Sequence, residues 1–270
     1  METKTAGGVA VPTLGFGTYK LTGEAGENAI RDALEMGYRH IDTAEFYDNQ
    51  AAVGRAITES AVDREDVFLT TKIWKTNLEP ARVHQRTRDA LADLDTDYVD
   101  LLLIHWPSET VPIEETVEAM NELQGEGLVR SIGVGNFSVD QLRAAIAASE
   151  TPVVTNQVEY NLRAPHPDLL RFALDNDVLL TAYGPLARGG VLEEPALVEI
   201  AEAHGKTPAQ TALRWLIQQP PVVAIPKAGD RDHRYENLQV FDFELSDDEM
   251  RRLFEVAGEY DDDLLATMGY

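Results

Sequence analysis

An alternation of short apolar segments with amphipathic helical segments runs through almost the whole chain and limits its fold more than any other feature. We predict strands at residues 14–19, 40–42, 67–74, 98–106, 131–137, 153–159, 179–186 and 222–227. Predicted helices lie at 27–36, 51–59, 80–94, 113–126, 141–148, 169–176, 208–218, 234–241 and 247–256. Because each strand is followed by a helix, the strands are expected to be parallel.

The number and composition of these strands predict that the sheet closes on itself. The fourth strand contains Leu101-Leu102-Leu103-Ile104, an apolar run that is expected when both faces of a strand are buried. Eight strand–helix units without a linker fit the 270 residues of the chain. We therefore predict an α/β fold, a (β/α)8 TIM barrel, as a single domain over residues 1–270. A short N-terminal hairpin at 9–12 and a C-terminal helix and tail complete it.

Polar side chains follow the carboxyl ends of three consecutive predicted strands. Asp42 ends the second strand, Tyr47 comes five positions later, and Lys72 and His105 end the third and fourth strands. In a barrel of parallel strands these ends share one face, where we expect a catalytic centre.

These four groups suit the reduction of a carbonyl group. A free phenol has a pKa near ~10, and a nearby lysine is expected to lower the pKa of Tyr47 and make it a better proton donor. Asp42 is expected to hold Lys72 in its charged form, and His105 to orient the carbonyl oxygen or assist proton transfer. A Schiff-base enzyme that uses Lys72 as an amine is the weaker alternative, because an amine paired with a carboxylate stays protonated.

Over residues 14–245 the chain resembles the aldo-keto reductases, most closely the prokaryotic diketogluconate reductase branch. The residues that carry the resemblance are Asp42-Thr43-Ala44 with Tyr47, Thr71-Lys72 with Trp74, and His105-Trp106-Pro107. The resemblance implies NAD(P)H-dependent reduction of aldehydes and ketones to alcohols, with hydride from nicotinamide C4 and the proton from Tyr47. A noncatalytic cofactor-sensing regulatory subunit on the same barrel is the alternative.

The resemblance also assigns residues to the nicotinamide end of the cofactor. Amides at two strand ends are expected to hold the carboxamide, and an aromatic ring is expected to stack on the nicotinamide. The residues at this end are Thr18, Asp42, Asn136, Gln157 and Tyr183, and Leu186 is a further cofactor-binding residue. Glycines at 135 and 184 stand where the family usually has serine, which removes a side-chain hydrogen bond at each position.

The segment after the eighth strand resembles the family's adenosine-phosphate site. Lys227 matches the lysine that meets the 2′-phosphate of NADP, whereas Ala228 and His233 replace a serine and an arginine. Arg231 and Arg234 are candidates to compensate for the lost charge. Glu236 and Asn237 match adenine contacts. We therefore expect NADP(H) as the cofactor, with tolerance of NAD(H).

Aromatic side chains are expected to surround the substrate, a small carbonyl compound, beside His105. They are Tyr19, Phe46, Trp74 and Trp106. The loop at 109–113 and the tail after residue 256 are short, so the pocket is expected to be open. Lys75 and Arg188 are basic residues that would favour anionic or sugar-acid substrates, and the sequence leaves this preference open.

The formal net charge of −24 excludes several classes of partner. A surface this acidic repels nucleic acid and anionic membranes, so neither is expected to bind. Together with the scarcity of lysine it favours adaptation to molar salt over an ordinary acidic protein. No apolar run is long enough for a membrane span or a signal peptide, so we expect a cytoplasmic protein.

Other classes of site lack support in the sequence. There is no cysteine, and the histidines at 40, 84, 166 and 204 show no metal-ligand spacing, so no metal site is expected. No Gly-x-Gly-x-x-Gly opens a helix and no Gly-x-Ser-x-Gly is present, which disfavours a Rossmann domain and a serine hydrolase. By resemblance, a monomer is expected.

Overall fold

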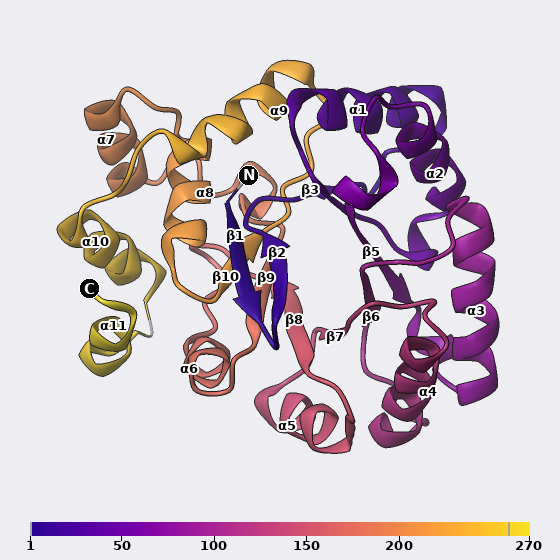
Figure 1. Ribbon diagram of the computed structural model, residues 1–270. Coiled ribbons are helices and arrows are strands. Elements are labelled where there is room, and N and C mark those ends of the chain that lie inside the picture. The colour runs from indigo at the N-terminus through magenta and orange to yellow at the C-terminus, as the bar shows by residue number, and fades with distance from the viewer. Residues whose placement is uncertain (1, 259) are drawn as a thin grey trace.

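A closed barrel of parallel strands forms the centre of the molecule in the computed structural model, which describes residues 2–258 and 260–270 (Figure 1). Within those residues the sheet has eight strands in sequential order. They are β3 (Phe16–Gly17), β4 (His40–Asp42), β5 (Phe68–Ile73), β6 (Leu101–Ile104), β7 (Ile132–Gly135), β8 (Val153–Glu159), β9 (Leu179–Tyr183) and β10 (Val222–Ala224). A parallel bridge between Leu14 and Ala224 joins the two edges, so the predicted α/β (β/α)8 TIM barrel is confirmed.

Helices surround the barrel (Figure 1). They are α1 (Gly23–Met36), α2 (Gln50–Thr58), α3 (Pro80–Asp93), α4 (Ile113–Gly125), α5 (Val139–Ala148), α6 (Pro167–Asp175), α7 (Pro195–His204), α8 (Pro208–Gln218), α9 (Arg231–Leu238), α10 (Asp247–Ala257) and α11 (Asp262–Met268). Helices α5, α8 and α10 each begin with a capping box, which satisfies backbone N–H groups of the first turn. None of the helices in the described residues is long and apolar enough to cross a membrane.

Apolar side chains fill the barrel at the end where its strands begin. This inner core comprises Leu101, Leu103, Val154, Leu179 and Val223, together with Ala6 and Val11. The last two belong to the antiparallel hairpin of β1 (Thr3–Ala6) and β2 (Val9–Pro12), which lies across this end of the barrel (Figure 1). A larger apolar cluster fills the layer between sheet and helices. The inner core and the hairpin close one end, so a polar site has room only at the other.

The hairpin is also fastened to the barrel by Lys4. Its ammonium donates to the carbonyl oxygens of Ile217, at 2.6 Å, and of Val222, at 2.7 Å, and also to that of Gln219. These carbonyls lie where α8 ends and β10 begins. A cation at the end of a helix satisfies carbonyl groups that lack partners within the helix.

Helices α7 and α11 were not among the sequence predictions, although both carry terminal signals. Helix α7 has Pro195 in its first turn and Gly205 as a left-handed C-cap. Helix α11 has Asp261 as its N-cap, whose side chain accepts a hydrogen bond from the Leu264 backbone N–H, and Gly269 as its left-handed C-cap. The tail after residue 256 is therefore partly helical.

The prediction for α9 was wrong at both ends. The helix runs from Arg231 to Leu238 instead of 234–241, because the side chain of Asp230 accepts hydrogen bonds from the backbone N–H groups of Asp232 and His233. A 3-10 turn, Gln239–Phe241, follows.

The acidic composition leads to a testable prediction for stability. With 47 acidic against 23 basic residues, like charges repel one another at low ionic strength and the folded state bears most of that cost. We expect the melting temperature to rise as KCl is increased from about 0.05 M to about 2 M, by about 2–4 °C for each kcal/mol of repulsion removed. Calorimetry would measure the melting temperature at each KCl concentration. A flat or falling melting temperature in KCl would contradict the prediction.

Candidate active site

A buried ion pair between Asp42 and Lys72 lies at the carboxyl ends of β4 and β5. The Lys72 Nζ is 2.6 Å from Asp42 Oδ1, and each residue is only 1% exposed. The ammonium also donates to the carbonyl oxygen of Thr43, at 2.8 Å, and to the hydroxyl oxygen of Tyr47, at 3.3 Å. All three donor positions of the ammonium are therefore used, and one of them is directed at the phenol.

The electrostatics of this pair keep the lysine charged. Burial lowers the pKa of Lys72, but the Asp42 carboxylate and then Tyr47 outweigh that effect, so the net shift is upward from the usual 10.5. The stabilisation that the charged lysine contributes is thus fully present below pH 10.5 and is lost as the pH rises through the pKa of the folded protein.

Tyr47 remains a neutral phenol in this setting. Burial raises its pKa, Lys72 lowers it, and Asp42 raises it again, and the net shift is upward. The expectation that Lys72 lowers the pKa of Tyr47 below its usual value was therefore wrong, because burial is the larger effect. Because the ammonium donates to the phenol oxygen, the O–H of Tyr47 stays free to donate to another molecule.

His105 is an uncharged imidazole beside Tyr47. The centres of the two rings are 5.7 Å apart, and the ring planes are nearly perpendicular. Burial, and then the positive charge of Lys72, lower the pKa of His105 to about 3. Its Nδ1 is buried and has no hydrogen-bond partner among the described residues. At neutral pH His105 can orient a carbonyl oxygen but carries no charge.

Two amide side chains and a tyrosine extend this polar layer across the barrel. Gln157, at the end of β8, donates from Nε2 to Asp42 Oδ2 at 2.8 Å. Asn136, after β7, donates to the carbonyl oxygen of His105 at 2.9 Å and accepts from the hydroxyl of Tyr183, also at 2.9 Å. The predicted residues Asn136, Gln157 and Tyr183 thus lie together, in contact with Asp42 and His105.

The backbone geometry explains why residue 135 is a glycine, one of the two positions at which the family usually has serine. A Cβ atom at Gly135 would lie 2.9 Å from the carbonyl oxygen of His105, so a serine would require β6 and β7 to separate. Asn136 follows with φ of 63°, a left-handed conformation that asparagine adopts more readily than most residues. Gly135 therefore lets Asn136 approach His105.

These positions fit the nicotinamide end of a dinucleotide. Gln157 uses its N–H for Asp42, whereas its Oε1 accepts no hydrogen bond from the described residues and could accept one from a carboxamide. Thr18 is buried and donates from its hydroxyl to the backbone oxygen of Asp42, which places it behind the ion pair. Leu186 lies half-buried on the loop after β9.

Aromatic side chains lie close to Tyr47 and His105. Phe46 stacks on Trp74 with ring centres 4.1 Å apart, and the ring of Tyr19 lies 5.1 Å from that of Tyr47. Tyr19, Phe46 and Trp106 remain 47%, 53% and 40% exposed. Large exposed aromatic groups beside a proton donor suit the binding of a small, partly apolar molecule.

The predicted adenosine-phosphate segment lies after β10, with a different distribution of charge from that expected. Lys227 and His233 are exposed. Arg234 is only 5% exposed, and its guanidinium contacts Asp32, at 2.7 Å, and the carbonyl oxygen of Gly229, at 2.8 Å. Arg231 also pairs with Asp32, at 3.1 Å. The two arginines thus share the single Asp32 carboxylate, which offsets one of their two positive charges, and Arg231 remains exposed.

The two predicted adenine contacts differ in exposure. Glu236 is half-buried on α9, whereas Asn237 is buried beside the hydroxyl of Tyr38. The structure therefore does not bring Asn237 to the surface of this segment.

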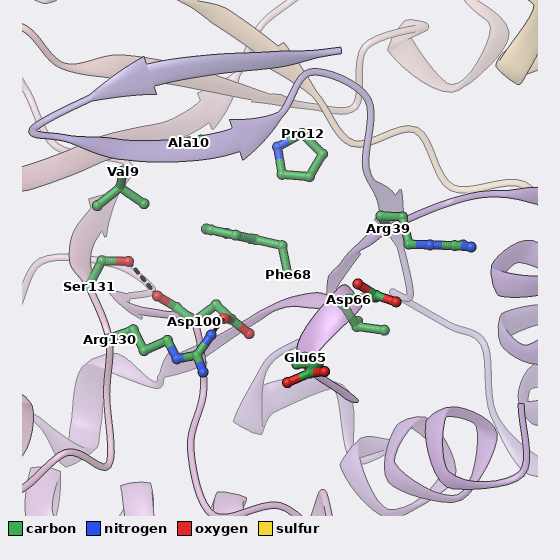
Figure 2. Close-up of a pocket in the computed structure, with 11 residues that line it drawn as sticks. Val9, Ala10, Pro12, Arg39, Glu65, Asp66, Phe68, Asp100, Arg130 and Ser131 are labelled. Carbon is green, nitrogen blue, oxygen red and sulfur yellow. Dashed lines mark hydrogen bonds and ion pairs between the residues drawn. The ribbon is translucent and has the colours of Figure 1, made fainter. Parts of the chain in front are cut away.

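A hollow at the other end of the barrel contains none of these groups. A space of about 310 Å³ lies between the N-terminal hairpin and the starts of the strands, and Phe68 is among the residues that line it (Figure 2). Asp100 on its wall is already paired with Arg64, at 2.9 Å, and with Arg130, at 3.0 Å. Because its carboxylate is satisfied and the reactive groups lie elsewhere, this hollow is not the candidate active site.

Two residues of the stretch after β4 have roles that the sequence analysis missed. Asn49 donates to the backbone oxygens of Thr18 and Leu21, both at 2.9 Å, and so connects the loops after β3 and β4. The Glu45 carboxylate accepts a hydrogen bond from the backbone N–H of Trp74 at 2.8 Å. The only signal in the sequence for these roles was the closeness of Asn49 and Glu45 to Tyr47, because their hydrogen bonds join segments that are far apart in the chain.

Comparisons with known proteins agree with this geometry. The model of the aldo/keto reductase family matches residues 13–257. Methylglyoxal reductase DkgB from Yersinia pestis is 41% identical over 213 residues, 78% of this chain and 80% of that protein. Methylglyoxal reductase DkgB from Escherichia coli O157:H7 is 38% identical over 248 residues, 91% and 92% of the two chains. A crystal structure of the thermostable aldo-keto reductase Tm1743 superimposes with a TM-score of 0.91 at 41% identity, covering 95% of this chain and 100% of that one.

The buried ion pair leads to a stability prediction. Asp42→Asn leaves the Lys72 ammonium buried without a carboxylate, so we expect a loss of about 3–5 kcal/mol in the free energy of unfolding. Replacing both residues, as Asp42→Leu with Lys72→Met, removes both charges and should cost less than the single change. Urea denaturation at constant KCl concentration would measure both. A single variant as stable as the wild type would show that the pair is not buried as described.

Proposed function

The chain belongs to the aldo/keto reductase family, whose model matches residues 13–257, and from this premise we propose that it reduces aldehydes and ketones to alcohols with Tyr47 as the proton donor. One observation carries the proposal: a lysine that is held charged by a buried carboxylate donates to the phenol oxygen of Tyr47. This contact leaves the phenol proton for the substrate and places a positive charge where the phenolate forms.

The residues of the site divide the chemistry among them. Tyr47 donates its proton to the substrate oxygen as the carbonyl carbon is reduced, and the remaining phenolate is stabilised by Lys72. Neutral His105 orients the carbonyl oxygen toward Tyr47. Asp42 keeps Lys72 protonated through the cycle, which also argues against Lys72 as a Schiff-base nucleophile. A bound nicotinamide supplies the hydride.

The nicotinamide would be held by the amide layer across the barrel. Asn136 and Gln157 would bind the carboxamide, with Thr18 and Asp42 behind them, and Tyr183 would present its ring to one face. Leu186, on the loop after β9, would line the path of the diphosphate. The support is that Gln157 and Asn136 already contact the ion pair and His105.

We favour NADP(H) as the cofactor, with NAD(H) also accepted. Lys227 is the exposed cation of the adenosine segment that has no ion-pair partner among the described residues, and it would meet a 2′-phosphate there. The imidazole of His233 would lie over the adenine, and Glu236 would contact its edge. Arg231 and Arg234 are engaged by Asp32, so one lysine carries the preference and the margin over NAD(H) should be small.

The substrate class is inferred from the opening and from the relatives. An exposed aromatic rim admits small aldehydes, ketones and dicarbonyl compounds. Two relatives bear the name methylglyoxal reductase, so 2-oxoaldehydes are the first substrates to test.

The proton donor is tested by removing one oxygen atom. We expect Tyr47→Phe to lower kcat for methylglyoxal reduction in molar KCl by about 10²–10⁴-fold, because general acid catalysis is lost. NADPH binding, followed by nucleotide fluorescence, should persist. Tyr98→Phe, which removes a hydroxyl at the far end of the barrel, serves as the control. A wild type that binds NADPH but reduces no reactive aldehyde would favour the cofactor-sensing alternative.

The cofactor preference is tested at His233. We expect His233→Arg to raise the ratio of kcat/KM with NADPH to that with NADH by about 10–100-fold, because a charged hydrogen bond is worth roughly 1.5–3 kcal/mol. Gln85→Arg adds the same charge on the exposed face of α3 and should leave the ratio unchanged. Equal ratios in all three proteins would place the 2′-phosphate away from His233.

A further inference from the structure

We propose that Glu45 is a positioning residue whose carboxylate fastens the turn that carries Tyr47 to the segment following Lys72. The inference rests on the proposed function, in which Tyr47 is the proton donor. It adds a residue that touches neither the substrate nor the reacting atoms and that acts through the placement of Tyr47.

The turn that carries Tyr47 is weak by itself. It is a 3-10 helix of three residues, Glu45–Tyr47, in which Glu45 and Tyr47 are half-buried and Phe46 is exposed. Its backbone bonds are few: Tyr47 N–H to Ala44 O at 3.1 Å, and Asp48 N–H to Glu45 O at 3.3 Å. Isolated 3-10 turns of this length have poor hydrogen-bond geometry, so other contacts must fix the position of the phenol.

The direct contact between the phenol and the lysine is too weak to do this alone. The Tyr47 oxygen lies 3.3 Å from Lys72 Nζ, whereas the bonds from the same ammonium to Asp42 and Thr43 are 2.6 and 2.8 Å. The lysine is therefore held firmly by other partners, and Tyr47 has to be brought to it.

The Glu45 carboxylate provides that connection with both of its oxygens. Oε2 accepts from the backbone N–H of Trp74 at 2.8 Å, and Oε1 accepts from the side-chain amide of Asn77 at 2.6 Å. Oε1 also pairs with Nε of Arg86 on α3, at 3.2 Å. Trp74 is two residues after Lys72, so the carboxylate links the two segments that carry the phenol and the ammonium.

The hydrogen bonds matter more than the ion pair in this arrangement. The Arg86 side chain is 46% exposed, and salt screens such a pair strongly. The Asn77 side chain is buried, and without Glu45 its amide and the Trp74 N–H would lose their carboxylate partner. Phe46, the residue after Glu45, stacks on Trp74 and so adds a second contact between the same two segments.

The test compares variants in molar KCl. We expect Glu45→Ala to lower kcat for methylglyoxal by about 10–100-fold, because a displacement of about 1 Å in a catalytic group can cost 10²-fold. Glu45→Gln should recover part of the rate, since its carbonyl can still accept from the Trp74 N–H. Cofactor affinity should not change. Arg86→Ala should retain most of the rate if the hydrogen bonds dominate.

A second measurement reports the position of Tyr47 without relying on turnover. In protein labelled with carbon-13 at the tyrosine Cζ, the Tyr47 resonance is assigned by its absence in Tyr47→Phe. It is sensitive to the hydrogen bond from Lys72, so we expect it to shift in Glu45→Ala and to return toward the wild-type value in Glu45→Gln. Glu79→Gln, which removes an exposed carboxylate at the start of α3, should change neither the resonance nor kcat.

The outcomes separate this inference from the proposed function. A loss of kcat in Glu45→Ala with an unchanged Tyr47 resonance, or an equal loss in Glu79→Gln, would overturn the positioning role. If the wild type reduces no carbonyl compound, the proposed function fails. The resonance then still decides whether Glu45 holds Tyr47 against Lys72.

Discussion

The ion pair between Asp42 and Lys72 is the interaction on which the candidate site depends. Two buried charges are costly unless they are paired and their remaining hydrogen-bonding capacity is satisfied. Here Asp42 accepts from Lys72 and Gln157, and Lys72 donates also to Thr43 and Tyr47. Strands β4, β5 and β8 are therefore tied together by one polar cluster inside the barrel. The same cluster directs a positive charge at the phenol, so stability and chemistry use the same atoms.

The sequence was informative about residues at the ends of strands, and much less so about contacts between distant segments. Asp42, Tyr47, Lys72 and His105 could be placed together because parallel strands bring their carboxyl ends to one face. The pairing of Asp32 with Arg234 could not, since it joins residues 202 positions apart. The balance between burial and Lys72 at Tyr47 was also misjudged, because burial is a property of the folded chain.

Charge is distributed very differently on the surface and in the site. The chain carries a formal net charge of −24, yet the proposed reaction requires an anionic cofactor to approach. Molar salt would screen the repulsion. Asp32 pairs with Arg231 and Arg234, so that Lys227 is the exposed cation of the segment after β10 that has no ion-pair partner among the described residues. A single cation can favour a 2′-phosphate without making it essential, which is consistent with use of both dinucleotides.

The most direct measurement is the pH dependence of kcat/KM for carbonyl reduction, in the wild type and in Lys72→Met. We predict one decline at alkaline pH, as Tyr47 loses its proton, and no step near the ordinary histidine pKa of 6.5, because the pKa of His105 is about 3. Lys72→Met should be slower and should decline at higher pH, since Lys72 lowers the pKa of Tyr47. An alkaline decline that is unchanged in Lys72→Met, or that persists in Tyr47→Phe, would contradict the assignment of Tyr47 as the proton donor tuned by Lys72.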